Sequence, residues 1–289
     1  MSWRTVVISN RCKLDLKLGY MVVRGEETKR IFLNEVALVL IENPAVSLTG
    51  CLLEALTERK IRVIFCDSKR SPMAELVPHH GSHDTTRKLR QQLSWSEEIK
   101  GTVWSRIIGE KIRLQAQHLA DLKLQKEALL LESYLSQIEF QDSSNREGHA
   151  AKVYFNALFG KDFSRREEHP LNAAMNYGYS ILLSAFNREI SSAGYITELG
   201  IHHDNVFNHF NLSSDLMEPF RILVDRKIMK LEPKELDKDT KHALVNLLNS
   251  SVEIGHTSQT VLNAIRIYIT SVFAALNNED AGSIRFYQI

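Results

Sequence analysis

Cysteine is scarce in this sequence of 289 residues. The three cysteines, Cys12, Cys51 and Cys66, are odd in number and never form a CxxC pair. They therefore signal neither a disulfide framework nor a zinc site built from thiolates. Because disulfides are rare in reducing compartments, this usage favours a protein of the cytoplasm.

Glycine motifs that cradle phosphates are also missing. The 13 glycines include no GxG pair and no GxxxxGK[ST] stretch, and the chain contains neither HExxH nor GxSxG. These absences exclude the usual signals of a dinucleotide fold and of a nucleotide triphosphatase. We therefore expect no reaction that depends on ATP hydrolysis within this chain.

Long apolar runs are missing too. The longest, Val36–Ile41, is far short of the roughly 18 residues that a membrane span requires, so no membrane partner is expected. Apolar residues make up 44% of the chain and charged residues 25%, which is the composition of an ordinary folded protein. At about 100–200 residues per domain, two domains are expected.

Charge is unevenly distributed although the formal net charge is only +1. Residues 84–126 carry nine basic and five acidic side chains, whereas residues 141–220 carry six basic and ten acidic ones. This order suits a protein that holds a polyanion on one surface and a cation in a nearby cleft. Ordinary solvated helices can produce the same fluctuation.

Strand patterns dominate the first 76 residues. Alternating or β-branched apolar residues predict strands at 5–9, 13–18, 30–33, 36–41 and 62–66. The unbroken apolar run at 36–41 is typical of a strand buried on both sides. Residues 48–56 have apolar positions at helical spacing and predict one short helix.

A linker and then helices are expected after residue 76. Pro72, Pro78, Gly81 and the histidines 79, 80 and 83 favour a linker, placed at 77–85. Three histidines so close together also suggest a metal site, but they lack partner carboxylates at fixed spacing. From residue 86 to 289 the apolar residues follow helical spacing. The expected fold class is α+β, an amino-terminal β-sheet or sandwich domain (1–76) followed by a larger all-helical domain (86–289).

Glu147 is the first candidate for chemistry. It lies in Ser144–Phe155, which predicts the start of a helix, and Ser144 followed three residues later by Glu147 also fits a capping box with a purely structural role. Gly148 lowers helix propensity, and together with Ala150 and Ala151 it leaves space beside Glu147.

The second candidate region runs from Leu199 to Arg221. Asp215 and Glu218, three residues apart, would share one face of a helix, and they too fit a helix cap. His203 is a candidate ligand beside them, whereas His202 is expected to be a satisfied core residue.

Together, Glu147, His203 and Glu218 offer carboxylate oxygens and one imidazole, with Asp215 nearby. Such a set suits Mg²⁺ or Mn²⁺ better than zinc, whose structural sites favour thiolates. Converging carboxylates would repel each other by about 4 kcal/mol per pair at an effective dielectric constant near 20. A divalent cation or a bound proton would relieve that repulsion. Spacing in the sequence leaves open whether these side chains converge.

Several stretches resemble one known family, the integrase of the CRISPR adaptation machinery, the first of the CRISPR-associated proteins. They lie in the family's order between residues 5 and 221: VVISNRCKLDLKLGYMVV, NPAVSLTGCLLEAL, VIFCD, REGHAAKVYF, FGKDFSRR, HPLNAAMNYGY, LGIHH and DLMEPFR. The chain is most similar to the branch from type II systems. The resemblance implies a β domain, used for dimerisation, joined to a helical catalytic domain.

The resemblance also implies roles for particular residues. The family's metal ligands are the glutamate of the REGxAAxxYF-like helix, the second histidine of the LGxHH-like turn and the acid of DLxEPFR, which fall on Glu147, His203 and Glu218. For Asp215 the resemblance leaves two roles open: contacting a metal ligand without binding the metal, or serving as an alternate ligand. With Mg²⁺ or Mn²⁺, the implied reaction joins 3′-hydroxyl ends of short DNA duplexes to a CRISPR repeat by transesterification.

The implied partners are double-stranded DNA, a second copy of the chain and a small second adaptation protein, in a four-plus-two heterohexamer. The type II effector nuclease and a ring-shaped DNA-end-binding protein are further implied partners. DNA contacts are expected from Arg87, Lys88, Arg90, Arg165 and Arg166, although such charges are ordinarily solvated faces.

Two alternatives remain open from the residues alone. The His203-Asp204 doublet in a helical region is compatible with an HD-type metal phosphohydrolase, which needs a further histidine and aspartate on neighbouring helices. The chain is also compatible with a non-catalytic DNA-binding scaffold whose acidic residues only cap helices.

Overall fold

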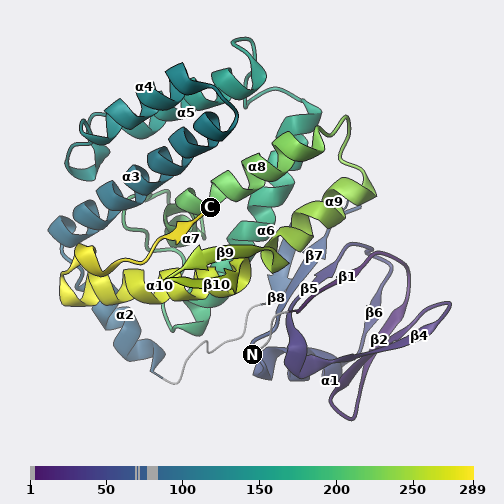
Figure 1. The fold of residues 1–289 in the computed structure, drawn as a ribbon. Coiled ribbons are helices and arrows are strands. Elements are labelled where there is room, and N and C mark those ends of the chain that lie inside the picture. The colour runs from purple at the N-terminus through teal and green to yellow at the C-terminus, as the bar shows by residue number, and fades with distance from the viewer. Residues whose placement is uncertain (1–3, 69, 71, 77–83) are drawn as a thin grey trace.

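The computed structural model describes residues 4–68, 70, 72–76 and 84–289 (Figure 1). The amino-terminal part contains β1 (Arg4–Ile8), β2 (Lys13–Lys17), β3 (Tyr20–Arg24), β4 (Thr28–Phe32), β5 (Val36–Ile41), β6 (Ser47–Leu48), α1 (Gly50–Glu58), β7 (Arg62–Cys66) and β8 (Pro72–Leu76). The carboxy-terminal part contains α2 (Thr85–Leu93), α3 (Glu97–Asp121), α4 (Gln125–Leu135), α5 (Arg146–Phe159), α6 (Pro170–Ser192), α7 (Asn211–Leu216), α8 (Arg221–Leu231), α9 (Lys238–Val245), β9 (Ser251–Ile254), β10 (Thr257–Thr260), α10 (Val261–Asn278) and β11 (Tyr287–Gln288).

β5 is a strand that contributes to the cores of both parts. It lies between β1 and β7, parallel to both, in a sheet of order β1-β5-β7-β8. Leu38 and Leu40 face the core of the helical part, whereas Val39 and Ile41 face a second core between the sheets. A strand covered on both faces must be apolar throughout, which explains the unbroken apolar run in the sequence.

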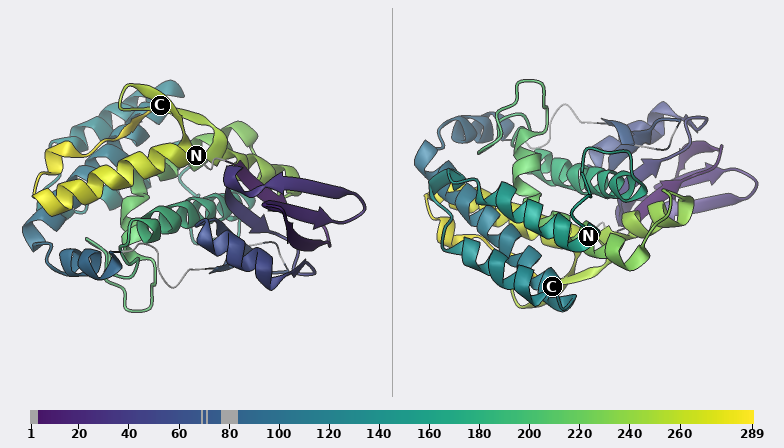
Figure 2. Two further views of the ribbon diagram at one scale, coloured as in Figure 1. Left: turned by 90° about the horizontal axis from the view of Figure 1, so that it is seen from below. Right: turned by 90° about the horizontal axis from the view of Figure 1, so that it is seen from above.

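The second sheet, of order β4-β3-β2-β6, projects away from the helices, as both views of Figure 2 show. Its inner face contributes Leu14 and Met21 to the core that it shares with the first sheet and α1. Its outer end exposes Leu18, Tyr20 and Phe32, and the last two rings lie 5.2 Å apart. This sheet therefore presents apolar surface to the outside.

α3 is the central helix of the carboxy-terminal part, with α4 and α5 against it (Figure 1). It begins after Ser96, whose hydroxyl accepts a hydrogen bond from the N–H of Ile99 at 3.2 Å, a typical N-cap. Trp104, Ile107 and Ile112 form a buried stripe on the helix. The same helix surface carries residues of the candidate site described below.

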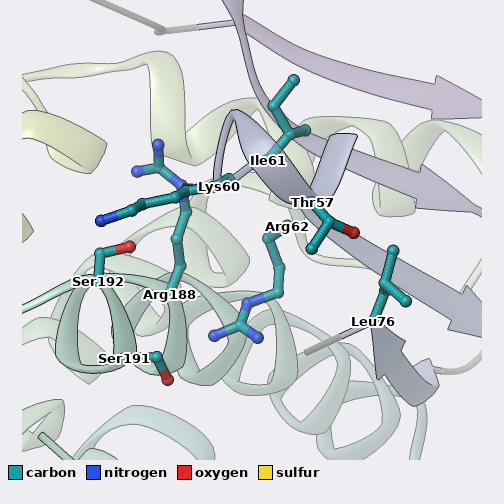
Figure 3. Close-up of a pocket in the computed structure, with 8 residues that line it drawn as sticks. All are labelled: Thr57, Lys60, Ile61, Arg62, Leu76, Arg188, Ser191 and Ser192. Carbon is teal, nitrogen blue, oxygen red and sulfur yellow. Dashed lines mark hydrogen bonds between the residues drawn. The ribbon is translucent and has the colours of Figure 1, made fainter. Parts of the chain in front are cut away.

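Polar side chains of both parts also meet beside β7. Within the first sheet, Arg62 on β7 pairs with Glu75 on β8, with 3.2 Å between Nη1 and Oε2. Arg188 on α6 donates from Nε to the carbonyl oxygen of Lys60 at 3.1 Å. Figure 3 shows Arg62 extending from β7 toward α6, and Arg188 extending from α6 toward Lys60, around a small cavity.

The expected α+β class is confirmed, with sheets up to residue 76 followed by a mostly helical region. The second part is nevertheless not all-helical, because β9, β10 and β11 form a small antiparallel sheet of order β10-β9-β11. These strands have only four, four and two residues, too few to produce a recognisable alternation.

The expected linker, 77–85, differs from the structure at its carboxyl end, and one proline counted toward its composition lies in a strand. Pro72, assigned to the linker composition, starts β8 at the edge of its sheet, where a missing N–H costs no ladder bond. Thr85, the last residue of the expected linker, is the first residue of α2. His79, His80 and His83, which suggested a weak metal site, lie outside the described residues. Within the described parts of the chain, no helix is long and apolar enough to cross a bilayer.

His118 on α3 generates a pH prediction for folding. Its buried Nδ1 lies 2.6 Å from the hydroxyl oxygen of Tyr154 on α5, and burial lowers the pKa of His118 from 6.5 to about 4. The unfolded chain therefore binds a proton before the folded protein does, so stability falls as the pH drops from 6.5 toward 4. Between pH 7 and pH 5 this residue alone should cost about 2 kcal/mol of unfolding free energy.

Urea unfolding at pH 5 and pH 7 measures this effect. We expect His118→Gln to have a smaller loss of stability between the two pH values than wild type, whereas His242→Gln, an exposed histidine on α9, keeps the wild-type loss. An unchanged loss in His118→Gln contradicts the assignment.

Candidate active site

Three separate segments of the chain meet at the ammonium group of Lys111. Lys111 lies on α3, and its Nζ is 2.6 Å from Oε1 of Glu147 and 2.5 Å from Oε2 of Glu218. The side chains of Lys111 and Glu218 are 9% and 5% exposed, and that of Glu147 is 26% exposed. The structure thus brings together two of the three predicted ligands.

Glu147 is held at the first turn of α5. Asn145, with a positive φ of 51°, is the N-cap, and its side chain accepts from the N–H of Gly148 at 3.2 Å. Asp142 accepts the N–H groups of Arg146 and Glu147 at 2.8 and 2.9 Å. The capping-box alternative is wrong, because Asn145 instead of Ser144 caps the helix and Glu147 turns toward Lys111.

Gly148 is explained by the same cap. A Cβ atom at this position would lie 2.6 Å from Oδ1 of Asn145, too close for a side chain to be accommodated without a shift. The glycine therefore lets the cap residue approach the helix, and the cap orients the first turn that carries Glu147.

Asp215 is completely buried and organises the loop that carries His203. Its Oδ2 accepts the N–H groups of Ile201 and His202 at 2.7 and 3.0 Å. Its Oδ1 accepts the N–H of His203 at 3.1 Å and lies 2.5 Å from Nδ1 of the same residue. The helix-cap alternative for Asp215 and Glu218 is wrong, since Asp215 lies inside α7 and binds this loop.

His203 is oriented by Asp215 and remains partly accessible. Its side chain is 44% exposed, and its ring meets that of Trp104 edge-on at 5.7 Å. The hydrogen bond to Asp215, with the charges of Asp215, Glu218 and Glu147, raises the pKa of His203 above its usual 6.5. With Nδ1 bound to Asp215, Nε2 is the nitrogen left for a ligand or a proton.

His202 is not the core residue that the sequence suggested. It is exposed, and its ring stacks on Trp104 with 4.2 Å between centroids and planes 5° apart. Stacking on the buried Trp104 covers one face of the His202 ring, while the residue as a whole stays exposed.

Glu218 begins a short 3-10 helix, Glu218–Phe220, just before α8. Its Oε1 accepts from Nε of Arg221 at 2.9 Å, so Lys111 and Arg221 both contact this carboxylate. Burial opposes its ionised form, but the charges of Arg221 and Lys111 prevail and lower the pKa of Glu218. Glu218 is therefore an ionised carboxylate at neutral pH.

A cavity of about 260 Å³ opens beside these groups. Asp225 on α8 lies in it and accepts a hydrogen bond from the Tyr179 hydroxyl at 2.5 Å, and burial raises the pKa of Asp225 to about 6. The lining residues include Lys111, Gln115, Glu147, Arg165, Tyr179, Glu218, Arg221 and Asp225.

The five predicted DNA contacts lie in two places. Arg165 lines the cavity, where it bonds Asn172 and Asn176 at 2.6 and 2.8 Å, and Arg166 beside it is exposed. The other three, Arg87, Lys88 and Arg90, lie on α2, where Arg87 pairs with Asp84 and Lys88 lies 5.4 Å from the Tyr195 ring centre.

α2 is attached to the segment that leads to His203. Gln92 on α2 donates to the carbonyl oxygens of Ile196 and Leu199 at 2.9 and 3.0 Å. The positive charges of α2 are thereby positioned on the surface next to the His203 loop.

The donor chemistry of the site fits a hard divalent cation. Two carboxylates and an imidazole nitrogen are ligands that Mg²⁺ and Mn²⁺ accept, and the carboxylates of Glu147 and Glu218 already share one positive charge. Within residues 4–68, 70, 72–76 and 84–289, no three His, Cys, Asp or Glu side chains are arranged to hold an ion together. The residues therefore fit a metal by type, while Lys111 stands between two of them.

Lys111, Gln115, Arg221 and Asp225 were missed in the sequence. A signal existed for the first two, because Lys111 and Gln115 continue the buried stripe of Trp104, Ile107 and Ile108 at helical spacing. A charged residue at such a position requires a buried partner of opposite charge.

Comparison with known proteins gives the class of this protein. It is similar to the CRISPR-associated endonuclease Cas1 of Neisseria meningitidis, with 31% identity over 295 residues that span 100% of this chain and 97% of that protein. The chain is a CRISPR-associated endonuclease. The model of the family "CRISPR associated protein Cas1" matches residues 5–246, and the chain belongs to the Cas1 family.

Solved structures share the fold. A casposase bound to its integration product has a TM-score of 0.77 at 18% identity, over 96% of this chain and 91% of that one. A chain of a Cas6-RT-Cas1–Cas2 complex has a TM-score of 0.76 at 20% identity, over 97% of this chain and 36% of that one.

Family membership decides between the open alternatives. The chain is an endonuclease of the Cas1 family, so the non-catalytic scaffold is wrong. The HD-type phosphohydrolase is wrong as well, and the exposed side chain of Asp204 lies outside the group around Lys111.

The hydrogen bonds of Asp215 predict a large effect on stability. In Asp215→Asn, an amide NH₂ would face N–H donors that now meet a carboxylate, so we expect a loss of about 3 kcal/mol in unfolding free energy. Asp204→Asn, on the same loop but exposed, should change it by less than about 0.5 kcal/mol. Urea denaturation of both variants provides the measurement, and equal stabilities would contradict the role of Asp215.

Proposed function

We propose that this Cas1 protein inserts short DNA duplexes into a CRISPR repeat array, using Glu147, His203 and Glu218 to hold Mg²⁺ or Mn²⁺. The main support is the convergence of Glu147 and Glu218 on one cation position within 2.5–2.6 Å of Nζ of Lys111. The contact between His203 and Asp215 adds an imidazole of fixed orientation.

The proposed reaction exchanges one phosphodiester for another. The 3′-hydroxyl oxygen of the incoming duplex bonds to a phosphorus at the repeat edge, the bond from that phosphorus to the repeat's own 3′ oxygen breaks, and the proton lost by the attacking hydroxyl is balanced by one gained by the leaving oxygen. No nucleotide is consumed, in agreement with the absence of a phosphate-binding glycine loop. A metal bound by the three residues would polarise the phosphate, activate the hydroxyl and stabilise the leaving oxygen.

The side chains around the cavity suggest distinct tasks. Asp215 keeps Nδ1 of His203 engaged, so Nε2 either binds the metal or accepts the proton of the attacking hydroxyl. Arg165, which lines the cavity, and Arg166 are proposed to contact the DNA backbone near the reacting phosphate. Arg87, Lys88 and Arg90 on α2 are proposed to contact the backbone farther away.

We propose that residues 1–76 form the dimerisation domain and that the catalytic domain extends from α2, which begins at Thr85, to residue 289. The exposed Leu18, Tyr20 and Phe32 on the projecting sheet support this, because apolar surface of this kind commonly lies in interfaces. Two such dimers are proposed to assemble with a dimer of a small Cas2-type partner. The type II effector nuclease, the ring-shaped DNA-end-binding protein and the location in the cytoplasm remain predictions.

The first experiment tests strand transfer and the three ligands. The protein and its small partner are incubated with a duplex bearing 3′-hydroxyl ends and a supercoiled plasmid carrying a repeat array, with and without Mg²⁺ or Mn²⁺. We expect joined product only with metal, and a loss of at least about 100-fold in Glu147→Gln, His203→Ala and Glu218→Gln, because each removes a ligand. Glu132→Gln, an exposed glutamate on α4, is the control and should join DNA as wild type does.

Two outcomes contradict the proposal. Normal joining by Glu147→Gln excludes that glutamate from the site. Absence of joined product from the wild type, with DNA binding intact, argues against strand transfer by this assembly.

The salt dependence of DNA binding tests the basic residues. A triple Arg87→Ala, Lys88→Ala, Arg90→Ala variant should reduce the slope of log affinity against log salt by up to about 3, because each phosphate that is no longer neutralised lowers the slope by about one unit. Arg165→Ala should reduce it by about 1 and Arg166→Ala by a similar amount, whereas Lys126→Ala on α4 should leave it unchanged. Fluorescence anisotropy over a salt series measures the slopes, and wild-type slopes in all variants would contradict these contacts.

A further inference from the structure

Lys111 occupies the place that a metal shared by Glu147 and Glu218 would need. Its Nζ is within 2.6 Å of one oxygen of each carboxylate, and the side chain is almost completely buried. A divalent cation that contacts both oxygens lies within about 2.0–2.6 Å of them. The ammonium and such a cation would overlap, so both cannot be present at that point together.

Gln115 offers the ammonium a second position. It lies on α3 one turn after Lys111, on the same face, and is 1% exposed. Gln115 lines the same cavity, and its Oε1 is buried and accepts no hydrogen bond from any residue that the structure describes. A buried carbonyl oxygen without a donor is costly, and a lysine ammonium is a donor within the same cavity.

Asp225 adds a negative charge on that side of the cavity. Its carboxyl lines the cavity with Gln115 and interacts electrostatically with Lys111. Turning from Glu147 and Glu218 toward Gln115 and Asp225 would therefore exchange one set of oxygen acceptors for another within the same cavity. The flexible four-carbon stem of lysine permits such a turn.

We propose that Lys111 is a resident counter-cation of the active site, which holds Glu147 and Glu218 together in the metal-free protein and turns toward Gln115 and Asp225 when a divalent cation binds. This inference rests on the proposed metal site. Lys111 is thus a positioning residue whose two arrangements correspond to the metal-free and the metal-bound protein.

The consequence is a reduced apparent affinity for metal. A site whose binding-competent arrangement is only partly populated binds with an affinity lowered by that fraction. If Lys111 leaves the two carboxylates about one tenth of the time, its removal should tighten metal binding about tenfold. Replacing Gln115, the acceptor that would receive the ammonium, should weaken metal binding, because the displaced ammonium then has a poorer second position.

Mn²⁺ binding to the full-length protein without DNA, at one fixed pH, tests the inference. Free Mn²⁺ is measured by electron paramagnetic resonance during a titration. We expect Lys111→Met to bind Mn²⁺ about tenfold more tightly than wild type, and Gln115→Met to bind it several-fold more weakly. Lys100→Met, a lysine on the same helix that pairs with Glu97, is the matched control and should bind as wild type does.

Thermal unfolding gives a second readout that does not depend on activity. Without metal, Lys111→Met should unfold at a lower temperature than wild type, since Glu147 and Glu218 lose their shared charge. Saturating Mn²⁺ should raise its unfolding temperature by more than it raises that of wild type. If Lys111→Met does not fold, Lys111→Gln, which keeps an NH₂ donor but no charge, replaces it in both measurements.

The outcomes separate this inference from the proposed metal site. Suppose that Glu147→Gln and Glu218→Gln abolish Mn²⁺ binding, but that removal of the Lys111 charge leaves the affinity for Mn²⁺ unchanged or lowers it. Lys111 is then not a competing cation, and the inference is overturned. If Glu147→Gln and Glu218→Gln both bind Mn²⁺ as wild type does, the metal is held elsewhere and the metal site under Proposed function fails first.

Discussion

The repulsion between a half-buried and a buried carboxylate is the constraint on which the candidate active site depends. Glu147 and Glu218 come from segments far apart in the chain and lie close together only because positive charge lies between and beside them, from Lys111 and Arg221. Ionised groups removed from water require such partners. The two carboxylates therefore favour a cation between them. The ammonium group of Lys111 occupies that position, and the same carboxylates would stabilise a divalent ion there.

Helical elements position Lys111, Glu147 and Glu218. Lys111 is in the middle of the long helix α3, Glu147 follows the Asn145 cap of α5, and Glu218 precedes α8. The exception is His203, which lies on a loop, and there Asp215 supplies the missing order through its hydrogen bonds to the loop. Orientation of a reactive side chain by a buried hydrogen-bond partner is a general means of preorganisation.

The sequence predicted those parts of the molecule that have a local pattern. The apolar run of β5 predicted a strand buried on both faces, and the long apolar stripes predicted the helices. The motifs around Glu147, His203 and Glu218 identified the candidate ligands by resemblance. Lys111 and Gln115 were missed because they interrupt an apolar stripe that is recognised by its apolar members alone. The surroundings of His202 and the sheet β10-β9-β11 depend on contacts between distant segments, which local patterns do not encode.

The double burial of β5 has a consequence for geometry. Since the same strand belongs to both hydrophobic cores, the projecting sheet and the cavity beside Lys111 are expected to move as one stiff body instead of two units on a hinge. In a dimer formed through that sheet, the distance between the two cavities would be fixed by the packing of side chains around Leu38 to Ile41. The buried strand β5 would thus set the separation of the two cavities in such a dimer.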